Sequence, residues 1–144
     1  MEKFEFTNIK FKSLIDLLNT FNTEEKCIDH LEYLRWKEKT VSPYDKDSTI
    51  VYLPDNMYYC CATKKLFNVR TNTCFEGNIP LQIWFVCVYL CHTRKVLKTD
   101  EIMRITGLTE INAKLVLKRF SKAGIKYTPK ITTQHRQKLK EGDK

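Results

Sequence analysis

The feature that most constrains the fold is an apolar run from Ile79 to Cys91, thirteen residues without a charged side chain. Proline at position 80 suits the first turn of a helix, where a backbone N–H has no partner within the helix. From Leu81 to Cys91 the run is apolar nearly all round, which predicts a helix buried on every side at the centre of the core. The run is too short to span a bilayer as a helix.

The chain before this run lacks the layout of an export signal. Met1 to Lys10 alternates charged residues with aromatic ones and contains no apolar stretch followed by small residues. The six cysteines are therefore expected to be reduced thiols. Together these features predict a soluble, cytoplasmic protein with no membrane partner.

Residues 1–38 are expected to form an N-terminal helical segment. Ser13 is placed to cap a short helix that runs to about Phe21. Asn22 and Glu25 then have the spacing of a capping box, which marks the start of a second helix. The second helix is expected to lead to Trp36 and to face the core through apolar positions at helical spacing, namely Cys27, Ile28, Leu31 and Leu34.

Residues 39–77 change to short β-prone runs separated by turns. Ser48–Leu53 and Met57–Cys60 flank the sequence Pro54-Asp55-Asn56, which is typical of a hairpin turn. Leu66–Arg70 supplies a third strand. A three-stranded sheet of this size has few long aliphatic side chains, and for this reason such sheets usually depend on a bound metal.

Two segments on either side of this hairpin have the spacing of the knuckles of a zinc ribbon. A structural zinc site needs four thiolate or imidazole ligands, usually supplied as two Cys-x-x-Cys pairs. Here the four positions hold Ser42, Asp45, Cys60 and Thr63. Because only one of them is a cysteine, the pattern indicates a degenerate zinc ribbon, and neither zinc nor another cofactor is expected.

Residues 78–125 predict a helix-turn-helix after the apolar helix. Thr99 is expected to cap a short helix, and Gly107-Leu108-Thr109 is expected to form the turn. Thr109 then caps a longer helix that ends at Ala123-Gly124. Residues 126–144 are polar and basic and are expected to form a flexible tail. The predicted fold class is α+β, with N-terminal helices, a small sheet and a C-terminal helix-turn-helix.

Positive charge is concentrated in the last third of the chain. Residues 1–93 hold 11 Lys/Arg against 12 Asp/Glu, whereas residues 94–144 hold 14 Lys/Arg against 5 Asp/Glu. This asymmetry favours a polyanionic partner, and double-stranded DNA first. The alternative is that the lysines form a solvated surface and that the two helices are a packing module.

The second helix of this pair separates an apolar face from a basic one. Its apolar residues fall at i, i+3, i+4 and i+7, whereas its lysines form a row on another face. In helix-turn-helix proteins the start of the second helix reaches base edges, and lysines contact phosphates. Thr109 and Asn112 are candidate base or backbone contacts, since an Asn amide can pair with adenine. The candidate phosphate contacts are Arg94, Lys95, Lys98, Lys114, Lys118, Arg119 and Lys122.

Three blocks in this order resemble the N-terminal region of zinc-ribbon insertion-sequence transposases of the DDE type. The first is Phe21–Trp36, which ends in that family's Leu-Arg-Trp signature. The second, Phe67–Thr73, looks like its Phe-Ser-Val-Arg-Thr-Gly-Thr segment. The third, Ile79–Phe85, is similar to its Pro-Leu-x-x-Trp-Phe helix start. With the helix-turn-helix, the resemblance covers about residues 11–124.

The chain departs from that family in two ways. The ligand positions of the ribbon are mostly lost, and the family's RNase H-like catalytic domain has no counterpart, because only Glu141 and Asp143 are acidic after Gly124. The resemblance therefore implies a non-catalytic DNA-binding protein and not an enzyme, truncated or repurposed in a bacterium or phage. The rival interpretation is a protein-interaction module that uses aromatic residues between Tyr44 and Tyr59. The oligomeric state is left open.

Overall fold

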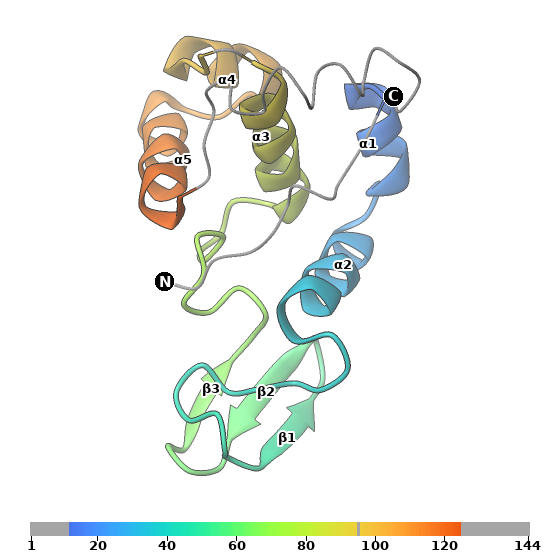
Figure 1. The fold of residues 1–144 in the computed structure, drawn as a ribbon, viewed down its shortest axis with the longest axis vertical. Helices are drawn as coiled ribbons and strands as arrows, with labels where there is room; N and C mark the ends of the chain where they lie inside the picture. Colours follow the sequence, from blue (N-terminus) through green and yellow to red (C-terminus); the bar gives the residue numbers. More distant parts are fainter. Residues whose placement is uncertain (1–11, 95, 125–144) are drawn as a thin grey trace.

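The computed structural model describes residues 12–94 and 96–124. This part of the chain is α+β, as predicted, with five helices and one three-stranded antiparallel sheet (Figure 1). The sheet lies at one end of the molecule, the last three helices and α1 lie at the other end, and α2 lies between them. The elements are α1 (Leu14–Thr20), α2 (Glu24–Trp36), β1 (Ile50–Leu53), β2 (Met57–Cys60), β3 (Lys65–Phe67), α3 (Leu81–Thr93), α4 (Thr99–Thr106) and α5 (Glu110–Ala123).

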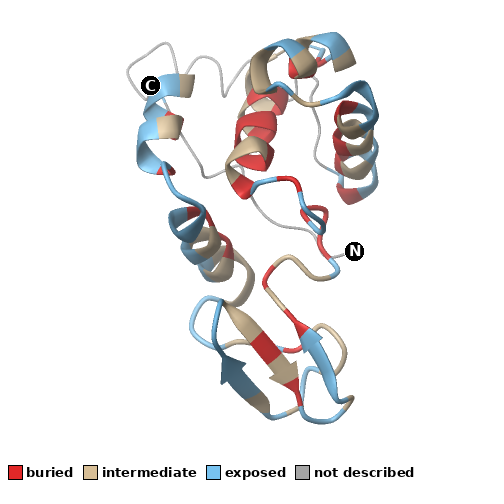
Figure 2. Cartoon of the chain, turned by 180° about the vertical axis from the view of Figure 1, so that it is seen from behind, coloured by how far each residue is buried: buried red, intermediate tan, exposed pale blue. Residues whose placement is uncertain are grey.

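Helix α3 is the centre of the main core, as its apolar sequence predicted. It packs against α1, α2 and α4; eight of its thirteen residues are buried and the other five are partly buried (Figure 2). Trp84 has no exposed surface and lies with its ring centroid 5.5 Å from Phe75 and 5.7 Å from Phe120. It therefore joins α3 to both the loop before it and α5. None of the described helices is both long and apolar enough to cross a membrane.

The two N-terminal helices begin at caps, one of which differs from the prediction. The Ser13 hydroxyl accepts a hydrogen bond from the Asp16 N–H at 3.1 Å, as expected. The cap of α2 is Thr23 and not Asn22. Thr23 has an extended backbone, and its hydroxyl accepts a bond from the Lys26 N–H at 3.2 Å. The capping box predicted from Asn22 and Glu25 is therefore wrong, and α2 begins one residue later than expected.

The sheet has the order β1-β2-β3, and the hairpin between β1 and β2 lies where it was predicted. Asp55 and Asn56 turn the chain with φ of 62° and 61°, the left-handed conformation that these residue types tolerate. Strand β3 is Lys65–Phe67, so the predicted strand Leu66–Arg70 is wrong at its end. The chain leaves the sheet because the Asn68 side chain accepts a hydrogen bond from the Arg70 N–H at 2.8 Å.

One face of the sheet packs against the end of α2 and forms a small second core. Tyr58, Cys60 and Phe67 are buried there, and Trp36 of α2 stands edge-on to Tyr58 with ring centroids 5.4 Å apart. Tyr44 packs edge-on against Phe67 from the loop before β1. In this part of the chain, aromatic packing takes the place that a metal has in many small sheets.

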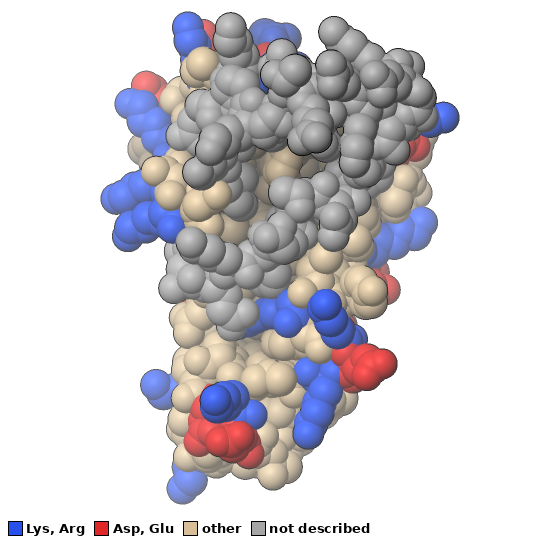
Figure 3. Space-filling view, in the orientation of Figure 1, with Lys and Arg blue, Asp and Glu red and all other residues tan. Residues whose placement is uncertain are grey.

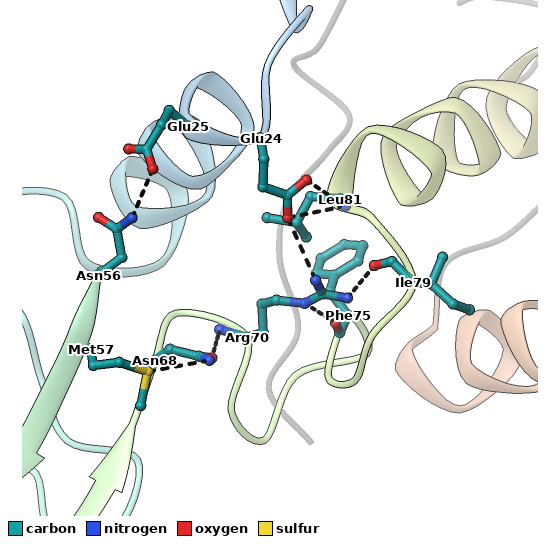
Figure 4. Close-up of polar contacts among 9 residues, drawn as sticks. All are labelled: Glu24, Glu25, Asn56, Met57, Asn68, Arg70, Phe75, Ile79 and Leu81. Carbon is teal, nitrogen blue, oxygen red and sulfur yellow. Dashed lines mark hydrogen bonds and ion pairs between the residues drawn. The ribbon is translucent and has the colours of Figure 1, made fainter. Parts of the chain in front are cut away.

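Arg70 ties the sheet to the helices (Figure 4). Its guanidinium donates to the Phe75 carbonyl at 2.6 Å and to the Ile79 carbonyl, and it lies 3.7 Å from the Glu24 carboxylate. Glu24 also accepts a hydrogen bond from the Leu81 N–H at 3.1 Å, at the first residue of α3. Glu24, Arg70 and Leu81 come from the three blocks of the family resemblance in turn, and their contacts here join the sheet to the helices.

Candidate nucleic-acid interface

Helices α4 and α5 are joined by a turn of three residues, Gly107 to Thr109. Gly107 ends α4 in the left-handed conformation with φ of 79°, and its N–H donates to the Met103 carbonyl at 2.9 Å. The Thr109 hydroxyl accepts a hydrogen bond from the Asn112 N–H at 3.2 Å, which confirms Thr109 as the cap of α5. Gly124 ends α5 in the left-handed conformation, also as predicted.

The start of α4 differs from its prediction. Lys98 has an extended backbone and occupies the cap position, whereas Thr99 is the first helical residue. No side chain caps this helix, because a lysine ammonium cannot accept a hydrogen bond. Asp100 and Glu101 in the first turn place negative charge at the positive end of the helix instead.

Helix α5 separates a buried face from a lysine face. Ala113, Val116 and Phe120 have no exposed surface, and Leu117 is partly buried at the edge of the core. At about 100° per residue, the row i, i+4, i+8 that starts at position 114 lies on the opposite side of the helix. This row is the lysine face, and its exposed members are Lys114, Lys118 and Lys122. Figure 3 shows Lys and Arg side chains gathered along the edge of the molecule where α5 lies.

Within residues 12–94 and 96–124, the lysine face makes one ion pair, and that pair is exposed. Lys114 lies 3.1 Å from the Glu110 carboxylate one turn earlier, and both side chains are about two-thirds exposed, at 65% and 63%. An exposed pair of this kind contributes about 0.3–0.5 kcal/mol to helix stability. A phosphate group can therefore replace Glu110 as the partner of Lys114 at little cost.

The two arginines predicted to contact phosphate are bound within the chain. Arg94 donates to the Glu101 carboxylate at 2.7 Å. Arg119 donates to the carbonyl oxygens of Cys74 and Glu76, and so fastens α5 to the loop before α3. We leave both out of the proposed contact set. Lys98 is exposed at the start of α4, whereas Lys95 lies outside the described residues.

Asn112 does not lie on the lysine face. It is partly buried and lines a groove of about 390 Å³ between α5 and the loop that precedes α3. On the helix it is about 120° away from Lys118. The neighbouring residue Ile111 does lie on the lysine face and is 79% exposed. The sequence contains this signal, since positions 111, 114 and 118 share one side of a helix and place an isoleucine among the lysines.

Two of the predicted ligand positions, Ser42 and Thr63, lie beside Cys60, whose side chain is fully buried. Ser42 is also buried, and its hydroxyl accepts hydrogen bonds from the N–H groups of Tyr44 at 2.9 Å and Asp45 at 3.2 Å. Burial of the Cys60 thiol acts to raise its pKa, but hydrogen bonding from Ser42, Ser48 and Thr63 outweighs this and lowers the pKa to about 6. The backbone N–H of Thr63 adds to the side-chain hydrogen bonds that lower the pKa of Cys60.

These positions do not fit zinc. They offer one thiolate, two hydroxyl groups and one carboxylate, and the Asp45 carboxylate already accepts a hydrogen bond from the Asp47 N–H at 2.9 Å. Across residues 12–94 and 96–124, no group of three or more His, Cys, Asp and Glu side chains is arranged to hold a metal ion. Here a set of hydrogen bonds around one thiol stands where the family resemblance implies a metal.

Comparison of the chain with protein-family models, with curated proteins and with solved structures finds no match. The relation to insertion-sequence transposases therefore stays a prediction, which rests on the three sequence blocks.

Proposed function

We propose that this chain is a non-catalytic protein that binds double-stranded DNA through α4 and α5. The observation that carries the proposal is the lysine face of α5. Lys114, Lys118 and Lys122 are exposed on the side of the helix opposite its buried residues, and α5 follows α4 after a turn of three residues. A helix that presents one basic side to solvent and is fixed on its other side suits the major groove.

In the proposed complex the lysine face contacts phosphates, and the first turn of α5 approaches the base edges. Lys98 lies at the start of α4 and adds a further phosphate contact. The phosphate contacts set affinity and orientation but carry no sequence information. Thr109 keeps its capping role, so we assign it to the position of α5 and not to base recognition. Neither zinc nor another cofactor is part of this proposal.

The salt dependence of DNA binding tests the proposal. Each phosphate contact contributes about −0.9 to the slope of log affinity against log salt. Replacing Lys114 and Lys118 together by alanine should therefore make the slope less steep by about 2. Raising the salt from about 50 to 200 mM should lower the affinity of both proteins, and the drop should be about tenfold smaller for the variant. The measurement is a titration of a labelled duplex at several salt concentrations.

A matched control is the double variant Lys26→Ala, Lys46→Ala. Both lysines are exposed, one on α2 and the other in the loop before β1, and neither lies on the lysine face. The control removes the same charge from the protein, so any effect of net charge alone should appear in it equally. The proposal fails if both double variants change the slope to the same extent, or if the wild type does not bind duplex DNA at low salt.

A second candidate function, protein interaction through the sheet, is favoured by exposed apolar residues on the outer face of the sheet. The register places Val51, Tyr59 and Leu66 side by side across the three strands, and Val51 and Leu66 are 44% and 55% exposed. Tyr44 and Tyr58, two of the aromatics predicted to serve as anchors, instead pack into the small core.

If this alternative holds, charged residues introduced on the outer face of the sheet should abolish complex formation with the protein partner and leave DNA binding unchanged. The variant Val51→Glu, Leu66→Glu tests it, because both side chains are exposed and the inner core is unchanged. If the double variant and the wild type form the same complexes at native expression level, the sheet face is not an interaction surface.

A further inference from the structure

Ile111 is the most exposed of the large apolar side chains in the described part of the chain, at 79%. The others with high exposure lie on α1, on α2, in the sheet or in loops, whereas Ile111 is on α5. It is the second residue of that helix and follows Glu110 directly. Its place is therefore the first turn of α5, at the end where the turn from α4 enters.

Ile111 lies within the lysine face and not at its edge. Positions 111, 114, 118 and 122 are related by i, i+3, i+7 and i+11, which keeps them on one side of a helix. Lys114 and Lys118 follow Ile111 by one and two turns and are both exposed. The same side of the helix thus offers an apolar contact at its start and cations along its length.

The fold does not need Ile111 in order to form α5. The helix is capped by Thr109 and fixed by Ala113, Val116 and Phe120, which point to the opposite side. A β-branched residue also has lower helix propensity than alanine or the charged residues common at exposed positions. The Ile111 side chain is therefore available for a contact outside the described part of the chain.

We propose that Ile111 contacts the C5-methyl group of a thymine in the major groove, and so makes binding depend on sequence. This inference rests on the proposed DNA-binding function and adds to it a specificity-determining residue. The thymine methyl is the only apolar group that an unmodified base pair presents in the major groove. The lysines would hold α5 against the phosphates, and the first turn of such a helix reaches the base edges.

The inference is tested by removing the methyl group from the DNA and the side chain from the protein in turn. A selection from random duplexes with the wild-type protein first gives a preferred site. Each thymine of that site is then replaced by deoxyuridine, which lacks only the methyl group. Wild-type protein should lose about fourfold in affinity at one position, the value for one buried methyl-sized group.

Ile111→Ala should bind the thymine and deoxyuridine duplexes equally, so the two losses should not add. Ile111→Val keeps a β-branched apolar side chain and should retain most of the discrimination. Ile15→Ala is the matched control, because Ile15 is 69% exposed on α1 and lies outside the lysine face. This control should discriminate as the wild type does. Circular dichroism melting of each variant shows that the fold is kept.

The inference is overturned if the deoxyuridine penalty is the same in wild type and Ile111→Ala, or if the selection yields no preferred thymine. Either result leaves the DNA-binding proposal standing, provided that binding still depends on salt and on Lys114 and Lys118. Absence of duplex binding by the wild type at low salt overturns both proposals. The two failures are therefore distinguishable in the same set of titrations.

Discussion

Replacing Trp84 by alanine and by phenylalanine should separate the stabilising effect of its packing from the cost of its buried indole N–H. Trp84 is fully buried against Phe75 and Phe120, so alanine leaves a large cavity between α3 and α5. A change of this type costs about 3–5 kcal/mol of stability. The Trp84 indole N–H, however, is buried without a hydrogen-bond partner in the described residues. Such an unsatisfied group itself costs about 1–3 kcal/mol.

Phenylalanine keeps most of the ring and removes that N–H. The smaller ring loses part of the packing, and the relief of the unsatisfied donor offsets much of this loss. Trp84→Phe should therefore cost about 1 kcal/mol or less, well below the alanine variant. With a urea m-value of about 2 kcal/mol/M, Trp84→Ala should lower the unfolding midpoint by about 2 M.

The assay is urea unfolding followed by circular dichroism, since one of the two tryptophans is altered. The Trp36→Phe variant is a useful comparison, because Trp36 is only partly buried and packs in the second core against Tyr58. Equal destabilisation by Trp84→Ala and Trp84→Phe would refute the reasoning about the indole N–H. A loss of unfolding free energy below about 1 kcal/mol for Trp84→Ala would refute the claim that α3 is the centre of the main core.

Further predictions concern the attachment of α5 and the thiol of Cys60. Arg119→Ala removes the hydrogen bonds to the carbonyls of Cys74 and Glu76, so it should lower stability by about 1.5–3 kcal/mol in urea titration and leave the salt slope of DNA binding unchanged. Thr109→Ala should cost about 0.5–2 kcal/mol in the same titration through loss of the α5 cap, and Thr109→Ser should cost less. Hydrogen bonding holds the pKa of the Cys60 thiol at about 6 in the folded chain, below its ordinary value of 9.0. A lowered folded pKa favours folding at high pH, so the thermal midpoint of the wild type relative to Cys60→Ser should rise between about pH 6 and 9 and level off outside this window; a pH-independent difference would contradict this.

The parts of the fold that were predictable from sequence are those fixed by local patterns. The apolar run of α3, the Ser13 and Thr109 caps and the hairpin turn at Asp55-Asn56 each depend on neighbouring residues only. Thr23, by contrast, competes with Asn22 for the same role. The geometry of the backbone, which the sequence does not contain, decides between two adjacent residues that can both cap a helix.

The contacts of the charged residues could not be predicted, because they join segments far apart in sequence. Arg119 reaches carbonyls in the loop before α3, more than forty positions away, and Arg70 meets Glu24 across a similar separation. From the sequence, Arg119 was expected to contact phosphate and Arg70 to end a strand. The segment around Cys60 shows another case: Ser42 and Thr63 lie beside the Cys60 thiol, but the spacing that suggested them as ligand positions does not predict their hydrogen bonds to it.

The salt dependence of duplex binding, measured for the wild type and for Lys114→Ala, Lys118→Ala, tests the central claim most directly. The account predicts a negative slope of log affinity against log salt that becomes less steep by about 2 in the variant and remains steep in Lys26→Ala, Lys46→Ala. Identical slopes in all three proteins, or no binding to duplex DNA at low salt, would contradict it.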